Sequence, residues 1–178
     1  PTADPAARFA ACVVIATETP LFVHLHGDVV AAVDEALKRA PEIPNVTRAT
    51  VDALVVRQAL CSLQRADAAG AVEAQATRAD ASTDGAPALL AATRGRLQVH
   101  LAGDGPPPVP ERPAATDPAA TLQWQWGVAE ARLRRQEYNA ADRALRDLFQ
   151  TARAIGPAAA DAAHFASLGR GFVAQTRD

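Results

Sequence analysis

The histidines are the residues through which this chain could bind a metal, and their spacing is unfavourable. His24 and His26 are two residues apart, which on a helix places them on nearly opposite faces, so they cannot hold one ion together. His100 and His164 are isolated in the sequence. The Glu-x-x-His and paired-cysteine motifs of bundle-core metal sites do not occur. The sequence therefore predicts no metal ligands.

Nucleophilic and phosphate chemistry are also disfavoured. The three serines, Ser62, Ser82 and Ser167, lie outside any Gly-x-Ser-x-Gly elbow. The segments 103–105 and 169–171 each resemble half of a phosphate loop, but both lack the following lysine and a preceding strand. We interpret both as turns and predict no catalytic or cofactor-binding residues.

The two cysteines, Cys12 and Cys61, define no disulfide framework and have no partner at metal-ligand spacing. We expect two small side chains that are buried or half-buried. The alternative is a single bridge between them in an oxidising compartment.

The composition favours long helices over other structures. The chain has 178 residues, of which 49% are hydrophobic and only 4% aromatic, so its core must be built from alanine, leucine and valine. The net charge of −2 gives no reason to expect nucleic acid, because phosphate binding needs a concentrated basic surface. The most apolar stretch, residues 9–16, is less than half the length of a membrane span.

The longest uninterrupted helical pattern runs from Thr121 to Phe149. Its apolar side chains recur at steps of three and four, with Tyr138 half a step out of line. Asp117-Pro118 marks the start and Gly156-Pro157 the end. We predict one continuous amphipathic helix here. Its apolar stripe comprises Leu122, Trp126, Ala129, Leu133, Ala141, Leu145 and Leu148.

Caps, prolines and apolar spacing predict the other elements. Pro1 to Arg8 has no periodicity and is interpreted as a loose leader. A helix beginning at Pro20 must stop or bend at Ala40-Pro41, because a residue before proline is pushed out of the helical region. Pro44 is the expected first residue of the next helix. The predicted helices other than the main one are residues 20–40, 44–81, 87–101 and 158–172.

Residues 103–118 are rich in proline and separate the helices into two halves. We interpret this connector as an extended linker that crosses the end or side of a bundle. The alternative is a ligand for a domain that recognises polyproline, because Pro107 to Pro110 satisfies PxxP.

Two features of the main helix suggest surface or interface roles. Trp126 falls on the core stripe, whereas Trp124 should lie at its margin, packed under the linker or exposed as an anchor for a partner. Glu130 and Arg134 are four residues apart and predict an exposed ion pair of a few tenths of a kcal/mol.

Two blocks of the sequence resemble the LemA family. The run Leu122-Gln123, Trp126, Ala129-Glu130, Leu133 and Arg135-Gln136-Glu137-Tyr138-Asn139 is similar to the family's C-terminal signature helix. Asp34, Leu37-Lys38-Arg39 and Ile43-Pro44-Asn45-Val46 resemble its upstream corner, in the right order and at about the right distance. The resemblance covers roughly residues 29–172. It departs from the family pattern at Trp126, Ala129 and Arg134, at Leu145-Arg146, and at the corner, which is one residue shorter and gains Pro41.

The resemblance implies an all-α fold, an antiparallel up-and-down bundle of long helices of four-helix type with the proline-rich connector. It implies a leader over residues 1–18 that follows a membrane helix in the intact protein, and a bundle domain over residues 19–178. A membrane-anchored, non-enzymatic interaction or scaffold domain with envelope or membrane protein partners is the implied function. The alternative is a bundle that binds a metal or a small hydrophobic ligand between its helices.

Structural roles are expected for the residues that carry the family signature. We expect Tyr138 and Asn139 to form a buried polar contact with the corner at residues 43–45. The signature residues are Asp34, Leu37, Arg39, Pro44, Asn45, Glu130, Arg135, Tyr138 and Asn139.

Overall fold

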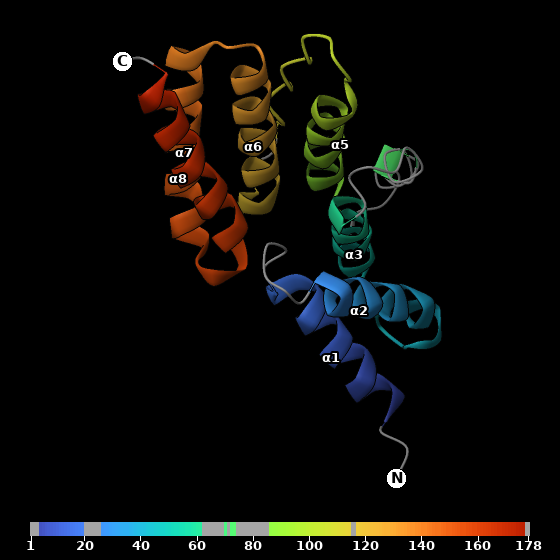
Figure 1. The fold of residues 1–178 in the computed structure, drawn as a ribbon. Helices are drawn as coiled ribbons and strands as arrows, with labels where there is room; N and C mark the ends of the chain where they lie inside the picture. The colour runs from blue at the N-terminus through green and yellow to red at the C-terminus, as the bar shows by residue number, and fades with distance from the viewer. Residues whose placement is uncertain are drawn as a thin grey trace. The chain divides into compact units, whose positions relative to one another are not determined.

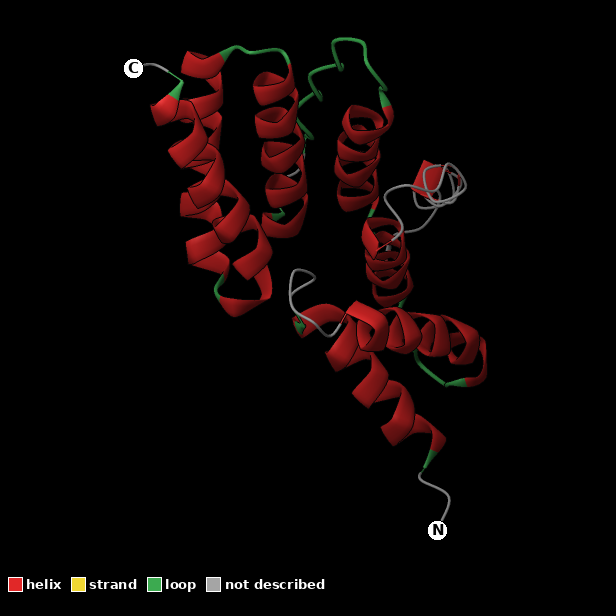
Figure 2. Cartoon of the chain, in the orientation of Figure 1, coloured by secondary structure: helices red, strands yellow, loops and turns green. Residues whose placement is uncertain are grey.

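The computed structural model describes residues 4–19, 26–61, 70, 72–73, 86–114 and 117–176. These residues form α-helices and two short 3₁₀ turns, with no strand among them (Figure 2). The predicted all-α class is confirmed. The chain folds into two compact units, Pro1–Pro87 and Ala88–Asp178. The expected division into a leader (1–18) and a bundle (19–178) stays a prediction.

The first unit begins with helix α1, Pro5–Glu18. The Asp4 side chain accepts a hydrogen bond from the backbone N–H of Ala6 at 3.1 Å, and Pro5 occupies the first helical turn, where its missing N–H removes no hydrogen bond. The prediction of a loose leader is therefore wrong from Pro5 onward. The signal was the Asp-Pro pair, which also begins the helix after the connector.

Helix α2, His26–Arg39, ends one residue before Ala40, as Pro41 predicts. A 3₁₀ turn, η1 (Ala40–Glu42), and a turn at residues 43–45 follow, in which Ile43 packs against the core while Pro44 and Asn45 are exposed. Asn45 adopts a φ of 64°, a left-handed conformation that asparagine tolerates better than most residues.

Helix α3, Arg48–Cys61, begins later than predicted, because Thr47 rather than Pro44 precedes the first turn. The Thr47 hydroxyl accepts a hydrogen bond from the Thr50 N–H at 3.2 Å, which satisfies a free donor of that turn. Beyond Cys61, the predicted helix 44–81 lies outside the described residues except for 70 and 72–73.

The core of the first unit is formed by α1, α2, η1 and α3. Cys12 and Cys61 are both half-buried and pack against this core, as predicted for two small side chains. The buried core residues are Phe9, Ala16, Val29, Val33, Ala36, Ala40 and Leu54.

The second unit contains α5 (Pro87–Leu101), α6 (Pro118–Arg134), α7 (Tyr138–Ile155), the 3₁₀ turn η2 (Pro157–Ala159) and α8 (Ala160–Gln175). The helices α6, α7 and α8 run in alternating directions around one core (Figure 1). Residues 103–105 form the predicted turn, but residues 169–171 lie within α8, so the turn predicted there is wrong. The buried core residues are Leu122, Ala129, Ala141, Leu145, Leu148, Ala152, Ala159, Ala162, Ala166 and Val173.

The predicted continuous helix is instead two helices that reverse at residues 135–137. Gln136 has a φ of 58°, its N–H bonds to the Leu133 carbonyl at 3.0 Å, and the Glu137 N–H bonds to the Arg132 carbonyl at 3.0 Å. This is the hydrogen-bond pattern of a Schellman motif, which ends a helix and turns the chain. The left-handed position of this motif is usually held by glycine, and here it is held by glutamine, so the residue type did not indicate a helix end. The sequence signal that did exist was Tyr138, which departs from the apolar spacing of the stripe.

The helices α5 and α6 run in the same direction because the connector returns along them. The Arg96 side chain of α5 bonds to Gln123 near the start of α6, while Arg134 at the end of α6 bonds to the carbonyl oxygens of Val99 and Gly103. The connector therefore crosses the side of the helix pair, as the linker interpretation predicts. Within the described residues, no helix is both long and apolar enough to cross a bilayer.

Candidate functional site

The most unusual polar group of the second unit is Arg96, an arginine at the centre of α5 that is only 5% exposed. Its Nη1 donates to Gln123 Oε1 at 2.9 Å, and its Nη2 lies 3.6 Å from Glu130 Oε1. Its guanidinium carbon is 3.6 Å from the centroid of the Trp126 ring, which in turn stacks on Phe165 at 5.3 Å. We name Arg96, Gln123, Trp126 and Glu130 the Arg96 cluster.

Burial dominates the electrostatics of this cluster. Desolvation lowers the pKa of Arg96, and the neighbouring Glu130 carboxylate opposes that change. Arg96 Nε, Glu130 Oε2 and Trp126 Nε1 are buried and make no hydrogen bond. The cation therefore depends on one amide, one carboxylate beyond hydrogen-bond distance and the face of one aromatic ring.

The predicted exposed pair between Glu130 and Arg134 is wrong. Glu130 faces Arg96 on α5, and Arg134 donates to the carbonyl oxygens of Val99 and Gly103. Arg134 thus satisfies carbonyl groups at the end of α5, where a positive charge also favours the helix dipole.

The connector is docked on α5 and α6 through Pro110. A Cβ added to Gly95 would lie 3.1 Å from Pro110 Cβ, and one added to Gly127 would lie 3.0 Å from Pro110 Cγ. Both glycines lie within helices, where glycine costs about 1 kcal/mol relative to alanine. The two helices therefore form a notch that fits one proline ring.

Polar contacts hold the connector on either side of this notch. Trp124 Nε1 donates to the Pro110 carbonyl at 3.1 Å, and the Arg112 guanidinium lies 5.5 Å from the Trp124 ring centroid. Pro107 is buried, and its carbonyl accepts from Arg135 Nη1 at 3.3 Å. The prediction that Trp124 packs under the linker is confirmed. We name Gly95, Trp124 and Gly127 the connector groove.

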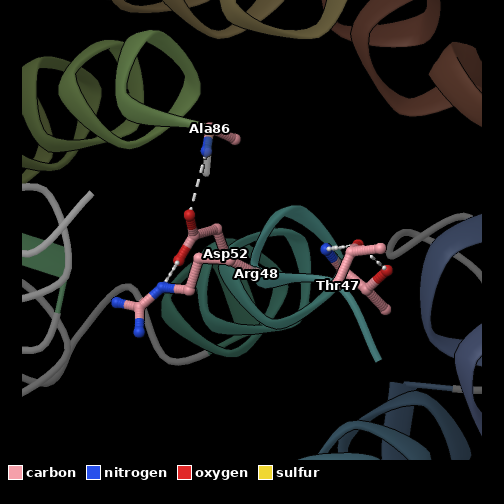
Figure 3. Close-up of polar contacts among 5 residues, drawn as sticks. Thr47, Arg48, Asp52 and Ala86 are labelled. Carbon is pink, nitrogen blue, oxygen red and sulfur yellow. Dashed lines mark hydrogen bonds and ion pairs between the residues drawn. The ribbon is translucent and has the colours of Figure 1, made fainter. Parts of the chain in front are cut away.

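A second buried charge, Asp52 on α3, belongs to the first unit (Figure 3). Asp52 is 0% exposed; its Oδ1 accepts from Arg48 Nε at 3.1 Å and its Oδ2 from the Ala86 N–H at 3.0 Å. The carboxylate thus ties α3 to a backbone group 34 residues away.

Two further carboxylates lie at the α6–α7 turn and between α7 and α8. Hydrogen bonds from Arg135 and Arg132 lower the pKa of Glu137. Hydrogen bonds from Arg146 and then Arg170 lower the pKa of Asp142, against the opposing effect of burial.

The upstream signature residues have ordinary structural places in the first unit. Asp34 is exposed on α2 and accepts from Gln58 Nε2 at 2.9 Å. Leu37 packs against the core, and Arg39 donates to Glu35 at 2.5 Å, which lowers the pKa of that carboxyl.

The downstream signature residues Tyr138 and Asn139 begin α7. Tyr138 is half-buried against Phe172, with ring centroids 6.2 Å apart, and Asn139 is exposed. Asn45 lies in the first unit and Asn139 in the second, and the contact predicted between their segments remains a prediction.

The outer face of α8 exposes apolar side chains. Leu168 is 63% exposed and Phe172 is 52% exposed, and they are four residues apart on the same face. A separate pocket of about 190 Å³ lies between α5, α6 and α8. It is lined by Val99, His100, Glu130, Leu133, Arg134 and Phe165. In the part of the chain that is described, no three His, Cys, Asp or Glu side chains gather to hold a metal ion.

The sequence interpretation did not predict the Arg96 cluster or the connector groove. The available signals were that Arg96 continues the face of Ala92 and Thr93 on α5, and that each helix contains one glycine. Comparisons with protein-family models, curated proteins and solved structures find no match to this chain. The resemblance to the LemA family therefore stays an expectation based on the residues quoted above.

Proposed function

We propose that this chain is a non-enzymatic interaction or scaffold domain of LemA type, held near a membrane in the intact protein. The observation that carries the proposal is the exposed apolar pair on α8, Leu168 and Phe172. Exposed side chains of this size, side by side on a helix, are typical of a surface that binds a protein. The partners in this proposal are envelope or membrane proteins.

The finer architecture belongs to the same proposal. Support for an up-and-down bundle comes from α6, α7 and α8, which are consecutive helices of alternating direction around one alanine- and leucine-rich core. The parallel run of α5 and α6 means that the fourth antiparallel helix of this proposal is not α5. A rigid bundle of this kind presents a helix face without an ordering cost on binding.

The test is to purify the membrane-anchored intact protein with its cross-linked neighbours and to compare two variants. Leu168→Glu places a charge on the exposed α8 face, and we expect it to remove a specific set of neighbours. Ala174→Glu adds the same charge at another exposed position of α8 and should retain them. An identical set of neighbours in both variants would contradict the proposal.

A second candidate function is supported by the pocket beside Val99, Leu133 and Phe165. Its volume of about 190 Å³ and these three apolar side chains, beside the polar His100, Glu130 and Arg134, suit a small amphipathic or hydrophobic ligand between helices. Native mass spectrometry of the purified protein should then reveal a bound small molecule that Leu133→Trp, which fills the pocket, removes. A protein that carries no added mass would eliminate this candidate.

A further inference from the structure

We propose that the connector groove is a recognition site for extended, proline-rich segments, and that the chain's own connector occupies it. This inference goes beyond the proposed function, because it concerns α5 and α6 rather than the exposed face of α8. It also differs from the interpretation of Pro107 to Pro110 as a ligand for another domain, because here the chain supplies both the ligand and the site.

The apolar part of the site is the notch formed by Gly95 and Gly127. The Pro110 ring lies 3.1 Å from the position a Cβ would take at Gly95 and 3.0 Å from that at Gly127, where Arg96 is also 3.1 Å away. At Gly95 the three atoms nearest to that Cβ position all belong to Pro110. The notch on α5 therefore faces the Pro110 ring directly.

The polar part of the site recognises backbone carbonyl groups. Trp124 Nε1 donates to the Pro110 carbonyl at 3.1 Å, and Arg135 Nη1 donates to the Pro107 carbonyl at 3.3 Å. Proline-rich segments make no internal hydrogen bonds, so their carbonyl groups are open to such donors. An aromatic side chain beside a proline slot is the chemistry by which polyproline-binding domains recognise PxxP.

The spacing of Pro107 and Pro110 also fits recognition of a polyproline helix. Pro107 is buried and Pro110 fills the notch, three residues later. A polyproline helix has three residues per turn, which places these two side chains on one face. Covalent attachment gives the connector an effective concentration in the millimolar range, so an external segment must compete with it.

The experiment empties the groove in the full-length chain. Pro107→Ala with Pro110→Ala removes both seated rings, and a synthetic peptide of residues 103–114, GDGPPPVPERPA, is then titrated while tryptophan fluorescence and heat of binding are recorded. We expect saturable binding to the emptied variant and at least about tenfold weaker binding to the unaltered chain. A folded, helical variant that does not bind the peptide would overturn the proposal.

A milder variant covers the case in which the double substitution unfolds the chain. Pro107→Ala alone leaves Pro110 in its notch but loosens the connector, so the peptide should bind with intermediate affinity. If this variant is folded and binds the peptide no more tightly than the unaltered chain does, the result would count equally against the proposal.

Matched glycine variants separate recognition from folding. In the emptied background, Gly95→Ala should weaken peptide binding by about tenfold or more, because its Cβ occupies the notch. Gly171→Ala, in α8 with nothing within 4 Å of the added Cβ, should leave binding unchanged. Equal binding by both glycine variants would also overturn the proposal. Leu168→Glu should leave peptide binding intact. The outcome for the connector groove is therefore independent of the outcome for the exposed α8 face.

Discussion

Asp52 and Arg96 are both charged side chains buried within a helix, but they differ in how their polar atoms are hydrogen-bonded. In the first unit, each oxygen of Asp52 accepts its own hydrogen bond, one from Arg48 and one from the Ala86 backbone. In the second unit, Arg96 has one hydrogen bond, from Nη1 to Gln123, an opposite charge at 3.6 Å and an unpaired Nε.

The difference shows two uses of a buried charge. A carboxylate with complete hydrogen bonding fixes the start of a new segment, because Ala86 is the residue immediately before α5. An arginine with incomplete hydrogen bonding depends on the face of another helix, since its amide, carboxylate and aromatic partners all come from α6. The second arrangement should be the more sensitive to loss of one partner.

The largest expected effect is that of Glu130→Ala. It removes the main opposite charge from a desolvated cation and leaves only the weaker attraction of Asp161, so we expect it to lower the free energy of unfolding by about 3 kcal/mol. Urea unfolding followed by tryptophan fluorescence measures this change. Adding Arg96→Met removes the unpaired cation and should recover a large part of the loss. A double variant as unstable as the sum of the two single variants would show that the charges are not coupled.

A smaller effect is expected for Asp52→Asn. The amide retains one acceptor oxygen but loses the charge that strengthens both hydrogen bonds, so the free energy of unfolding should fall by about 1–2 kcal/mol. Hydrogen exchange at the Ala86 amide gives the local measure, and this amide should lose protection. If Ala86 stays as protected as in the unaltered chain, the contact in Figure 3 does not hold the segment.

The smallest effect is the acid dependence of the second unit. The folded-state pKa values of Glu137 and Asp142 are lowered by arginine hydrogen bonds, so the stabilisation they provide is present above their unfolded values of about 4.3 and 3.9. It is lost as the pH falls through the lower, folded values. Asp142→Asn should flatten the decline in thermal stability below about pH 4. A decline as steep as that of the unaltered chain would exclude Asp142 as a contributor.

The sequence predicted helix boundaries best where proline or glycine sets a backbone limit. Helix α5 has its predicted bounds, α6 begins at Pro118, α7 ends before Gly156, and α2 ends before the Ala40-Pro41 step. These signals are local, because the ring or the missing side chain restricts the neighbouring dihedral angles directly.

The sequence did not predict helix ends where a residue other than glycine or proline sets the boundary. Gln136 takes a left-handed conformation, and Thr47 caps α3 three residues after the expected proline start. The candidate sites were also not predicted, because the partners of Arg96 and Pro110 come from segments more than ten residues away. Periodicity identifies which face of a helix is buried, but not which helix covers it.

The reversal at residues 135–137 also bears on how fast the second unit forms. It lets α6 and α7 pack as sequence neighbours, and the short turn before α8 does the same for the next pair. Low contact order of this kind is associated with folding in roughly microseconds to milliseconds. A single straight helix of the same residues could bury its apolar stripe only against helices distant in the sequence. Because the chain reverses at Gln136, α6 can instead pack against α7, the next helix in the sequence.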